Sequence, residues 1–202
     1  MKELTPRQKK SLDMKKNIYE VFNRLCKEYE GNVTVKDVCR EAGVSVGSFY
    51  NFFESKEAVT AAVYQYLNDE MLDWEYPQEP TERILAAAER LMRLSIEKGI
   101  HFLKMAALYE VDHTPTIVRS SYDGQVLFSA TADIIISALE EGAEKGLYKL
   151  EQPAWYYSDM IIFMHRSQLY FWTVNNGHYD PLSSQLSYTR FILDAISVKG
   201  RS

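Results

Sequence analysis

Hydroxyl, amide and ammonium side chains gather between positions 34 and 56 of this chain. They are Thr34, Ser48, Tyr50, Asn51 and Lys56. An amide can pair with both hydrogen-bonding groups of an adenine edge, whereas hydroxyl and ammonium groups bind phosphate oxygens. The set predicts contact with nucleic acid if the local fold brings its members onto one surface.

Two short helices joined by a tight turn are the elements expected to position these groups. Thr34 followed by Asp37 is a variant of the capping box and marks a helix start. Gly43 marks the end of that helix, because glycine adopts the left-handed conformation without steric cost. The apolar positions that would form its buried face are Val35, Val38, Cys39 and Ala42.

The second helix is predicted from Val46 to about Phe53, with Ser45 as its N-cap. A helix of this size fits a major groove. Phe49 and Phe53 are expected to face inward. The positions left facing outward, with Tyr50 to the side, are Val46, Gly47, Ser48, Asn51 and Phe52.

Base reading is expected from only a few of these outward side chains. Ser48 and Asn51 have good hydrogen-bonding capacity, and Asn51 can pair with adenine through two hydrogen bonds. The apolar Val46 and Phe52 would contact a thymine methyl group. Base selectivity is therefore expected to be modest, with phosphate contacts from Tyr50 setting the position of the helix.

The position of Lys56 independently indicates that an anion binds nearby. It stands at the first position of a helix that Ser55 would cap, where a cation opposes the helix dipole. A phosphate held by the helix N-terminus and the ammonium together would compensate. Thr34 is expected to contact phosphate as well. The alternative is that Lys56 is a solvated surface residue.

The segment resembles the helix-turn-helix of the TetR family of transcriptional regulators, whose usual form is aGVs, two small residues, then lYxxFxsKexL. The residues that match this form in register are Ala42, Gly43, Val44, Ser45, Gly47, Ser48, Phe49, Tyr50, Phe53, Ser55, Lys56 and Glu57. Val59 stands where leucine is common.

The resemblance implies an all-α protein with two domains. Residues 1–58 would form a three-helix DNA-binding domain, and residues 59–202 a larger helical domain for ligand binding and dimerisation. A first helix over residues 6–29 is expected to bury Ile18, Phe22 and Leu25. A helix over residues 56–74 would connect the two domains.

Composition supports an ordinary globular protein. Of its 202 residues, 46% are hydrophobic and 25% charged. No apolar run approaches the length of a membrane span and the N-terminus lacks the apolar part of a signal peptide, so we expect a cytoplasmic protein without a membrane partner.

The net charge of -5 is unevenly divided along the chain. Residues 1–58 carry 11 basic and 9 acidic side chains, and residues 59–202 carry 12 and 19. Lys2, Arg7, Lys9, Lys10, Lys15, Lys16 and Arg24 make the first 24 residues a basic arm. The arm would meet phosphates or a minor groove, or it is simply a solvated end of the chain.

Two later helices are more apolar than a surface helix requires. They are expected at residues 125–145 and 153–175, and a helix that is apolar nearly all round must be covered on all sides. The family resemblance implies that each subunit gives two helices to a four-helix dimer interface. The predicted interface residues are Ile134, Ile135, Leu139, Met160, Met164 and Phe171. The alternative is a monomer with two deep core helices.

The resemblance also implies a small-molecule pocket among the middle helices. Tyrosine is frequent, with 14 in the chain, and its apolar ring with a polar tip suits an amphipathic ligand. The predicted ligand contacts are Met92, His101, Met105, Tyr109, Tyr122, Phe128, Phe163 and Tyr170. Each of them also fits an ordinary helical core.

Neither a metal nor another cofactor is expected. Cys26 and Cys39 have no partner ligands at a metal spacing and lie on apolar faces. Glu110, Asp112 and His113 suit turn and cap chemistry, with no second ligand set at a recognisable spacing. His165 on its apolar helix is interpreted as a hydrogen-bonded core or interface residue.

The sequence thus predicts a homodimeric regulator, more specifically a repressor, that a small apolar or aromatic effector releases from a double-stranded palindromic operator. One alternative is a DNA-binding regulator that answers to a protein partner or to no ligand. An all-helical enzyme is a remote alternative, because the chain lacks a nucleophile-base pair, a phosphate-binding glycine loop and a metal pattern.

Overall fold

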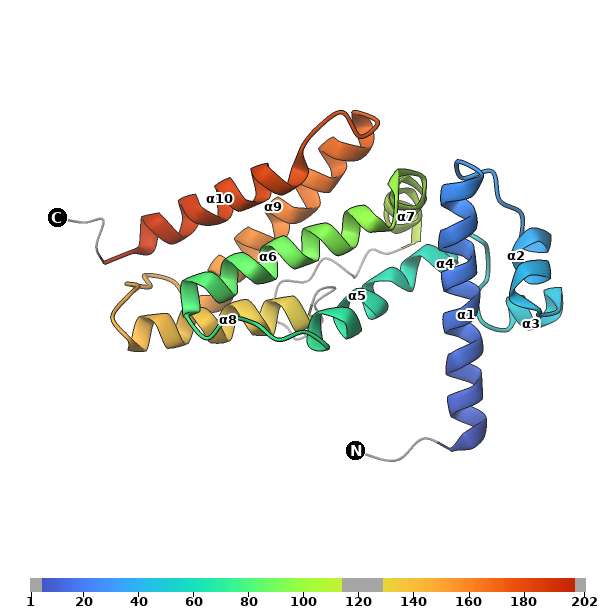
Figure 1. Cartoon of the computed structure of the whole chain (residues 1–202), viewed down its shortest axis with the longest axis horizontal. Coiled ribbons are helices and arrows are strands. Elements are labelled where there is room, and N and C mark those ends of the chain that lie inside the picture. The colour runs from blue at the N-terminus through green and yellow to red at the C-terminus, as the bar shows by residue number, and fades with distance from the viewer. Residues whose placement is uncertain (1–4, 114–128, 199–202) are drawn as a thin grey trace. The chain divides into compact units, whose positions relative to one another are not determined.

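The structure, a computed structural model, describes residues 5–113 and 129–198, and in these ranges all regular elements are helices (Figure 1). They are α1 (Pro6–Glu28), α2 (Val35–Ala42), α3 (Val46–Tyr50), α4 (Ala58–Ala61), α5 (Val63–Leu72), α6 (Pro80–Glu97), α7 (Ile100–His113), α8 (Ser129–Glu144), α9 (Ala154–Val174) and α10 (Pro181–Ile196). The prediction of an all-α protein is confirmed. Within the same ranges, no helix is long and apolar enough to cross a membrane.

The helices form two compact units. Unit 1 contains the described residues up to Val63 together with Lys98 and α7, and unit 2 contains Tyr64–Glu97 and residues 129–198. The division differs from the expected boundary between residues 58 and 59. The reason is that α7, although it follows α6 in the chain, packs against α1 and α4.

The core of unit 1 forms around α1. Ile18, Phe22 and Leu25 are buried as predicted. Phe102 of α7 is also fully buried, with its ring centroid 5.8 Å from that of Tyr19 and 6.1 Å from that of Phe22, both in edge-to-face arrangements. This aromatic cluster explains why α7 belongs to unit 1.

The N-terminal half of α1 contributes nothing to that core. Thr5 and Gln8 form a reciprocal capping box ahead of Pro6, which starts the helix firmly. Residues 5–13 are all exposed, and the first buried residue of α1 is Ile18. About three turns of helix therefore extend beyond the core of unit 1.

Two helices near the turn are shorter than predicted. α3 ends at Tyr50 rather than near Phe53, and the single helix expected over residues 56–74 is divided into α4 and α5, with Ala62 between them. Tight i→i−3 hydrogen bonds run from Val59, Thr60 and Ala62 to the carbonyls of Lys56, Glu57 and Val59. These 3₁₀-type turns replace regular α-helical pairing at the start of the segment.

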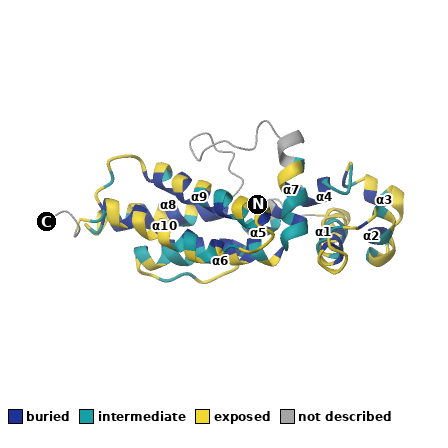
Figure 2. Ribbon diagram, turned by 90° about the horizontal axis from the view of Figure 1, so that it is seen from above, coloured by how far each residue is buried: buried dark blue, intermediate teal, exposed yellow. Residues whose placement is uncertain are grey.

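Unit 2 is organised around α6, which packs against α8, α9 and α10. The buried side of this helix consists of residues at helical spacing, which include Ile84, Ala87, Leu91 and Leu94. Arg83 of α6 donates to Glu141 of α8 at 2.8 Å. α9 pairs with both α8 and α10, and all three carry buried residues on some sides and exposed residues on others (Figure 2).

Candidate nucleic-acid interface

The corner between α2 and α3 has the geometry that the sequence predicts. Gly43 closes α2 with φ of 65°, and the amides of Gly43 and Val44 both donate to the carbonyl of Cys39. Nothing lies within 4 Å of the place where a Cβ on Gly43 would stand. Glycine is therefore required here for backbone conformation rather than for space.

α3 presents one side to solvent. Ser45 caps the helix by accepting a hydrogen bond from the Ser48 amide at 3.0 Å, and Phe49 anchors the opposite side in the core of unit 1. Val46 is 43% exposed and Tyr50 53% exposed. Gly47 and Asn51 are exposed as well, so the backbone of α3 is open to close approach by a ligand.

Asn51 is the outward polar side chain with the most freedom to read a base. Its side-chain amide makes no hydrogen bond within the described part of the chain. The Ser48 hydroxyl, in contrast, lies 2.8 Å from the Ser45 hydroxyl and is half-buried. Phe52 is half-buried too. The structure thus supports Asn51 more strongly than Ser48 or Phe52 as a reading residue.

Thr34 is held by its own helix cap. Its hydroxyl donates to Asp37 Oδ2 at 2.6 Å and accepts from the Asp37 amide at 3.2 Å. The Thr34 hydroxyl is also the main cause that lowers the pKa of the Asp37 carboxyl, which stays ionised. A carboxylate therefore occupies the N-terminus of α2, and a phosphate contact by Thr34 would have to compete with it.

Lys56 lies beside the start of α2. Its ammonium donates to the carbonyl of Val33 at 3.1 Å and is 3.8 Å from a Glu57 oxygen. Lys56 is not the first residue of an α-helix, because α4 begins at Ala58 and the Ser55 hydroxyl accepts from the Ala58 amide. The argument from the helix dipole is therefore weaker for Lys56 than the sequence suggests. Its ammonium nevertheless lies beside Val33, just before the start of α2, and a phosphate could be bound there.

Both cysteines are free thiols in the core of unit 1. Burial raises the pKa of Cys26 to about 12, against a smaller opposing effect of the nearby Lys56 ammonium. Burial also raises the pKa of Cys39. Thiols of this kind are poor nucleophiles, because the thiolate is the reactive form.

The residues predicted to bind a ligand are divided between the two units. His101, Met105 and Tyr109 lie on α7 in unit 1, whereas Met92, Phe163 and Tyr170 lie in unit 2. The Tyr109 hydroxyl donates to Glu54 at 2.6 Å, and this hydrogen bond is the main reason that the pKa of Tyr109 is raised to about 12. Met92 is fully buried, whereas Phe163 and Tyr170 are exposed. Tyr122 and Phe128 lie outside the described residues.

The predicted dimer residues differ in their accessibility. Ile135 and Leu139 are fully buried within α8 and serve the core of unit 2, so they are not available to a partner. Ile134 and Met164 are half-buried. Met160 and Phe171 of α9 are exposed.

A pair of exposed aromatic residues on α10 is not among the predicted site residues. They are Tyr188 and Phe191, and Phe191 is 74% exposed. Their spacing of three residues places them on one side of the helix, a different side from the buried Ile192 and Leu193. A helical-wheel plot of residues 181–196 would have shown this second apolar side. Among the described residues, no three histidine, cysteine or acidic side chains are placed to hold a metal ion.

Comparison with known proteins agrees with this geometry. Residues 31–63, which include α2 and α3, match the family described as bacterial regulatory proteins, tetR family. No curated protein sequence matches the chain.

Several solved structures share the fold. A TetR transcription regulator from Haloarcula marismortui ATCC 43049 has a TM-score of 0.64 at 16% identity, over 92% of this chain and 98% of that chain. FadR from Thermus thermophilus, a TetR-family repressor in complex with lauroyl-CoA, gives 0.61 at 17% identity, over 93% and 95%. RolR in complex with resorcinol gives 0.60 at 17% identity, over 95% and 91%.

The corner of α2 and α3 lies inside the matched segment, and the fold of TetR regulators extends over most of the remaining chain. Residues 31–63 are therefore similar to the bacterial regulatory proteins of the tetR family, and the described chain has the fold of TetR transcription regulators.

Proposed function

We propose that the protein is a homodimeric repressor that binds a palindromic operator and is released from it by a small apolar or aromatic effector. The observation that carries the proposal is the exposed side of α3, where Val46, Gly47, Tyr50 and Asn51 are free to enter a major groove. Asn51 would pair with adenine and Val46 would contact a thymine methyl group. Tyr50 and Lys56 would bind phosphates and fix the register.

Dimerisation is supported by exposed apolar stripes on two helices of unit 2. On α9 the stripe consists of Tyr156, Met160, Phe163, Tyr170 and Val174, and on α10 of Tyr188 and Phe191. The steps along each helix are three, four or seven residues, which is the spacing of a helix-helix contact. Since α9 and α10 pack together, a second copy of the same pair would cover both stripes in a four-helix interface.

The interface residues proposed here differ in part from those that the sequence predicts. α9 is retained, with Met160 in its stripe and the exposed Phe171 beside it. α10 replaces α8 because the exposed residues of α8, such as Asp133, Ser137 and Glu140, are polar. Phe163 and Tyr170, which are predicted as ligand contacts above, fit the α9 stripe better.

The class of effector is supported by two structures of similar fold. FadR from Thermus thermophilus is in complex with lauroyl-CoA, which carries a long apolar chain, and RolR is in complex with resorcinol, which is aromatic. Among the predicted ligand contacts of unit 2 that the structure describes, Met92 is buried. The wholly buried His165, whose Nε2 lies 3.2 Å from the Ser95 hydroxyl, would supply a polar partner to an apolar ligand with one polar end.

Selection of binding sites from a random DNA library tests the DNA-binding part. The expected result is enrichment of an inverted repeat whose half-sites are about one helical turn, or a multiple of a turn, apart. Enrichment of a single unrepeated site would contradict binding of a palindromic operator by a dimer. The absence of any sequence preference would refute sequence-specific DNA binding altogether.

The effector part is tested separately with acyl-CoA thioesters and small phenols. A bound effector should raise the melting temperature and lower affinity for the selected operator. If no compound changes either quantity while the operator still binds, a regulator without a small effector becomes the better description.

A further inference from the structure

We propose that one side of the N-terminal half of α1 is a second DNA contact, in which Arg7 and Lys15 bind backbone phosphates next to the groove that α3 enters. The inference rests on the proposed DNA binding by α3. It adds a defined surface, which we call the α1 strip and which consists of Arg7, Ser11 and Lys15.

The N-terminal half of α1 contributes no buried side chain to unit 1, although Asn17 at its end donates to the Ala42 carbonyl at 3.0 Å. Its side chains before Ile18 are exposed or half-buried, and the capping box at Thr5 still makes it a regular helix. Between residues 5 and 17, the basic side chains are Arg7, Lys9, Lys10, Lys15 and Lys16, and the single acidic one is Asp13. A rigid, exposed and basic helix suits a polyanion.

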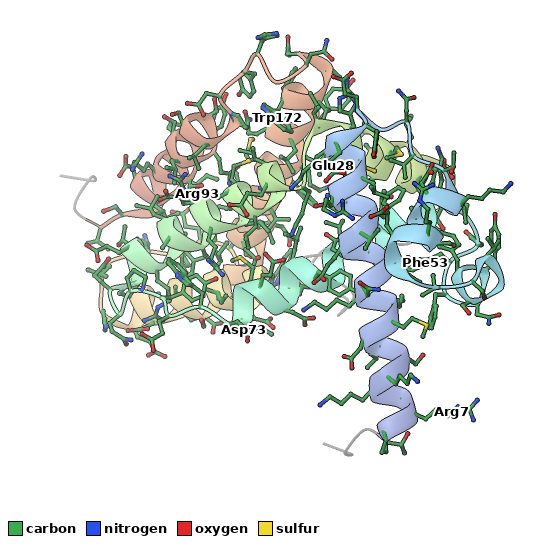
Figure 3. The ribbon with its side chains drawn as sticks, turned by 45° about the vertical axis from the view of Figure 1, so that its right-hand side comes forward. Arg7, Glu28, Phe53, Asp73, Arg93 and Trp172 are labelled. Atoms are coloured by element: carbon green, nitrogen blue, oxygen red, sulfur yellow. The ribbon has the colours of Figure 1, made fainter. Side chains whose placement is uncertain are left out.

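Helical periodicity shows which side of α1 faces the rest of unit 1. Arg7 precedes the buried Ile18 by eleven residues, and Lys15 precedes the buried Phe22 by seven, which are about three and two helical turns. Both cations therefore lie on the side of α1 that packs against the rest of unit 1. Figure 3 shows Arg7 pointing to the side of α1 on which Phe53 lies. Lys9 and Lys16 lie on the other side.

A direct contact ties the α1 strip to the recognition helix. The Lys15 ammonium lies 5.5 Å from the centre of the Phe53 ring, in a cation-π arrangement. The Phe53 ring in turn packs against Phe49 of α3, with 5.7 Å between ring centroids. Lys15 is thus held at the edge of the same aromatic cluster that supports the exposed side of α3.

The cations of the strip differ from those near α2. Arg24 is paired with Glu28 and Glu41, and Arg40 with Asp37. Within the described residues, neither Arg7 nor Lys15 has a carboxylate oxygen within 4 Å. Carboxylates therefore neutralise positive charge beside α2 and leave it available along the strip.

The spacing of the strip also fits a DNA backbone. Eight residues of α-helix separate Arg7 from Lys15, a rise of roughly 12 Å. Phosphates of one strand advance about 3.4 Å each along the duplex axis, so this separation is large enough for the two cations to contact different phosphates. Two phosphate contacts are therefore expected from each subunit.

The experiment compares two double variants that remove the same charge from opposite sides of α1. Arg7→Gln with Lys15→Gln removes the strip, and Lys9→Gln with Lys16→Gln is the matched control. Binding of the operator obtained by site selection is measured by fluorescence anisotropy between about 50 and 200 mM salt, a range over which phosphate contacts dominate the change in affinity.

For the strip variant, the slope of log affinity against log salt should fall by about 0.9 for each phosphate that the protein no longer neutralises, which is about 3 to 4 for a dimer. The control variant should change the slope by less than one such step. Equal slopes for the two variants would overturn the inference, because the salt dependence would then reflect the total charge of α1 and not the position of the charges. If the wild-type protein binds no operator, the proposed function itself has failed, and the two failures are thus distinguished.

Because Lys15 touches Phe53, its role is checked with a third variant. Arg7→Gln alone alters an exposed position and should leave the melting temperature unchanged while reducing the slope by about half as much as the double variant. A double variant that lowers the melting temperature, combined with no effect of Arg7→Gln on the slope, would assign Lys15 to folding and refute the strip.

Discussion

In the proposed mode of DNA binding, Asn51 supplies most of the hydrogen-bonding capacity on the exposed side of α3. Ser48 is engaged with Ser45, and the other outward residues are apolar or glycine, except for Tyr50 at the side. We predict that Asn51→Ala weakens binding to the preferred operator by about 1 to 3 kcal/mol per half-site, because one amide-adenine pair is removed. Affinity for unrelated DNA should stay the same, since phosphate contacts are untouched. Titrations on both DNAs measure the difference, and equal weakening on both would assign Asn51 to positioning.

His165 is a second residue with a defined expected behaviour. Burial, with a smaller effect of Arg166, lowers the pKa of His165 from 6.5 to about 3. In the folded protein the ring therefore stays neutral, next to the Ser95 hydroxyl. In the unfolded chain the ring takes up a proton below about pH 6.5.

This difference predicts a loss of stability on mild acidification. Between pH 6.5 and 3 the unfolded chain binds one more proton at His165 than the folded chain does, so stability is complete above about pH 6.5 and falls as the pH decreases. The contribution is roughly tenfold in the folding equilibrium constant for each pH unit. Urea unfolding at about pH 7, 6 and 5, at one protein concentration, measures it. A His165→Gln variant should lose this part of the pH dependence, and an unchanged slope would contradict the assignment.

At the scale of elements, the end of α8 depends on a glycine for close packing. A Cβ on Gly142 would overlap the ring of Tyr148, which is buried and whose hydroxyl lies 2.7 Å from that of Thr81 on α6. We predict that Gly142→Ala destabilises the protein by about 1 to 3 kcal/mol, because the ring must move. This outweighs the gain of about 1 kcal/mol that alanine brings to a helix.

A double-mutant cycle provides the control. In a Tyr148→Ala background the ring that a Cβ at Gly142 would overlap is absent, so Gly142→Ala should be neutral or stabilising there. Urea denaturation of the four proteins measures the coupling. Additive effects would mean that the ring and the glycine do not interact.

Helix starts were predictable because they depend on residues close together in the sequence. Thr5 with Pro6, Pro153, and Asp180 with Pro181 lie at the starts of α1, α9 and α10, where such residues commonly start helices. The break at Ala62 and the membership of α7 in unit 1 were not predictable in this way. The latter depends on packing between distant segments, since Phe102 is 80 or more positions from Tyr19 and Phe22.

The candidate site was predictable to the same degree. Spacing and residue type placed Val46, Gly47, Tyr50 and Asn51 on the exposed side of α3. The pairing of Thr34 with Asp37 in a cap was predictable from their spacing. A spacing pattern does not show that the short hydrogen bond between their side chains competes with the phosphate contact expected of Thr34.

For the whole molecule, the stripe on α10 predicts how assembly and DNA binding are linked. Phe191→Glu places a charge in the proposed interface, so we expect a monomer at micromolar concentration and a loss of about two orders of magnitude in operator affinity as the second half-site is given up. Light scattering during gel filtration measures the mass, and anisotropy measures the affinity.

Leu108→Glu is the matched control, because Leu108 is 69% exposed but lies on α7 in unit 1. It should leave the mass unchanged. A Phe191→Glu protein that remains dimeric would move the interface away from α10.

The place of α7 in unit 1 has a consequence for building hybrids of this protein. A fragment that ends at Val63 would lack Phe102 and leave the rings of Tyr19 and Phe22 without their aromatic partner. Unit 1 is therefore not formed by one continuous segment of the chain, and it cannot be isolated by truncation at a single position. Grafting it onto a different sensor requires two segments of chain, the one up to Val63 and the one that forms α7.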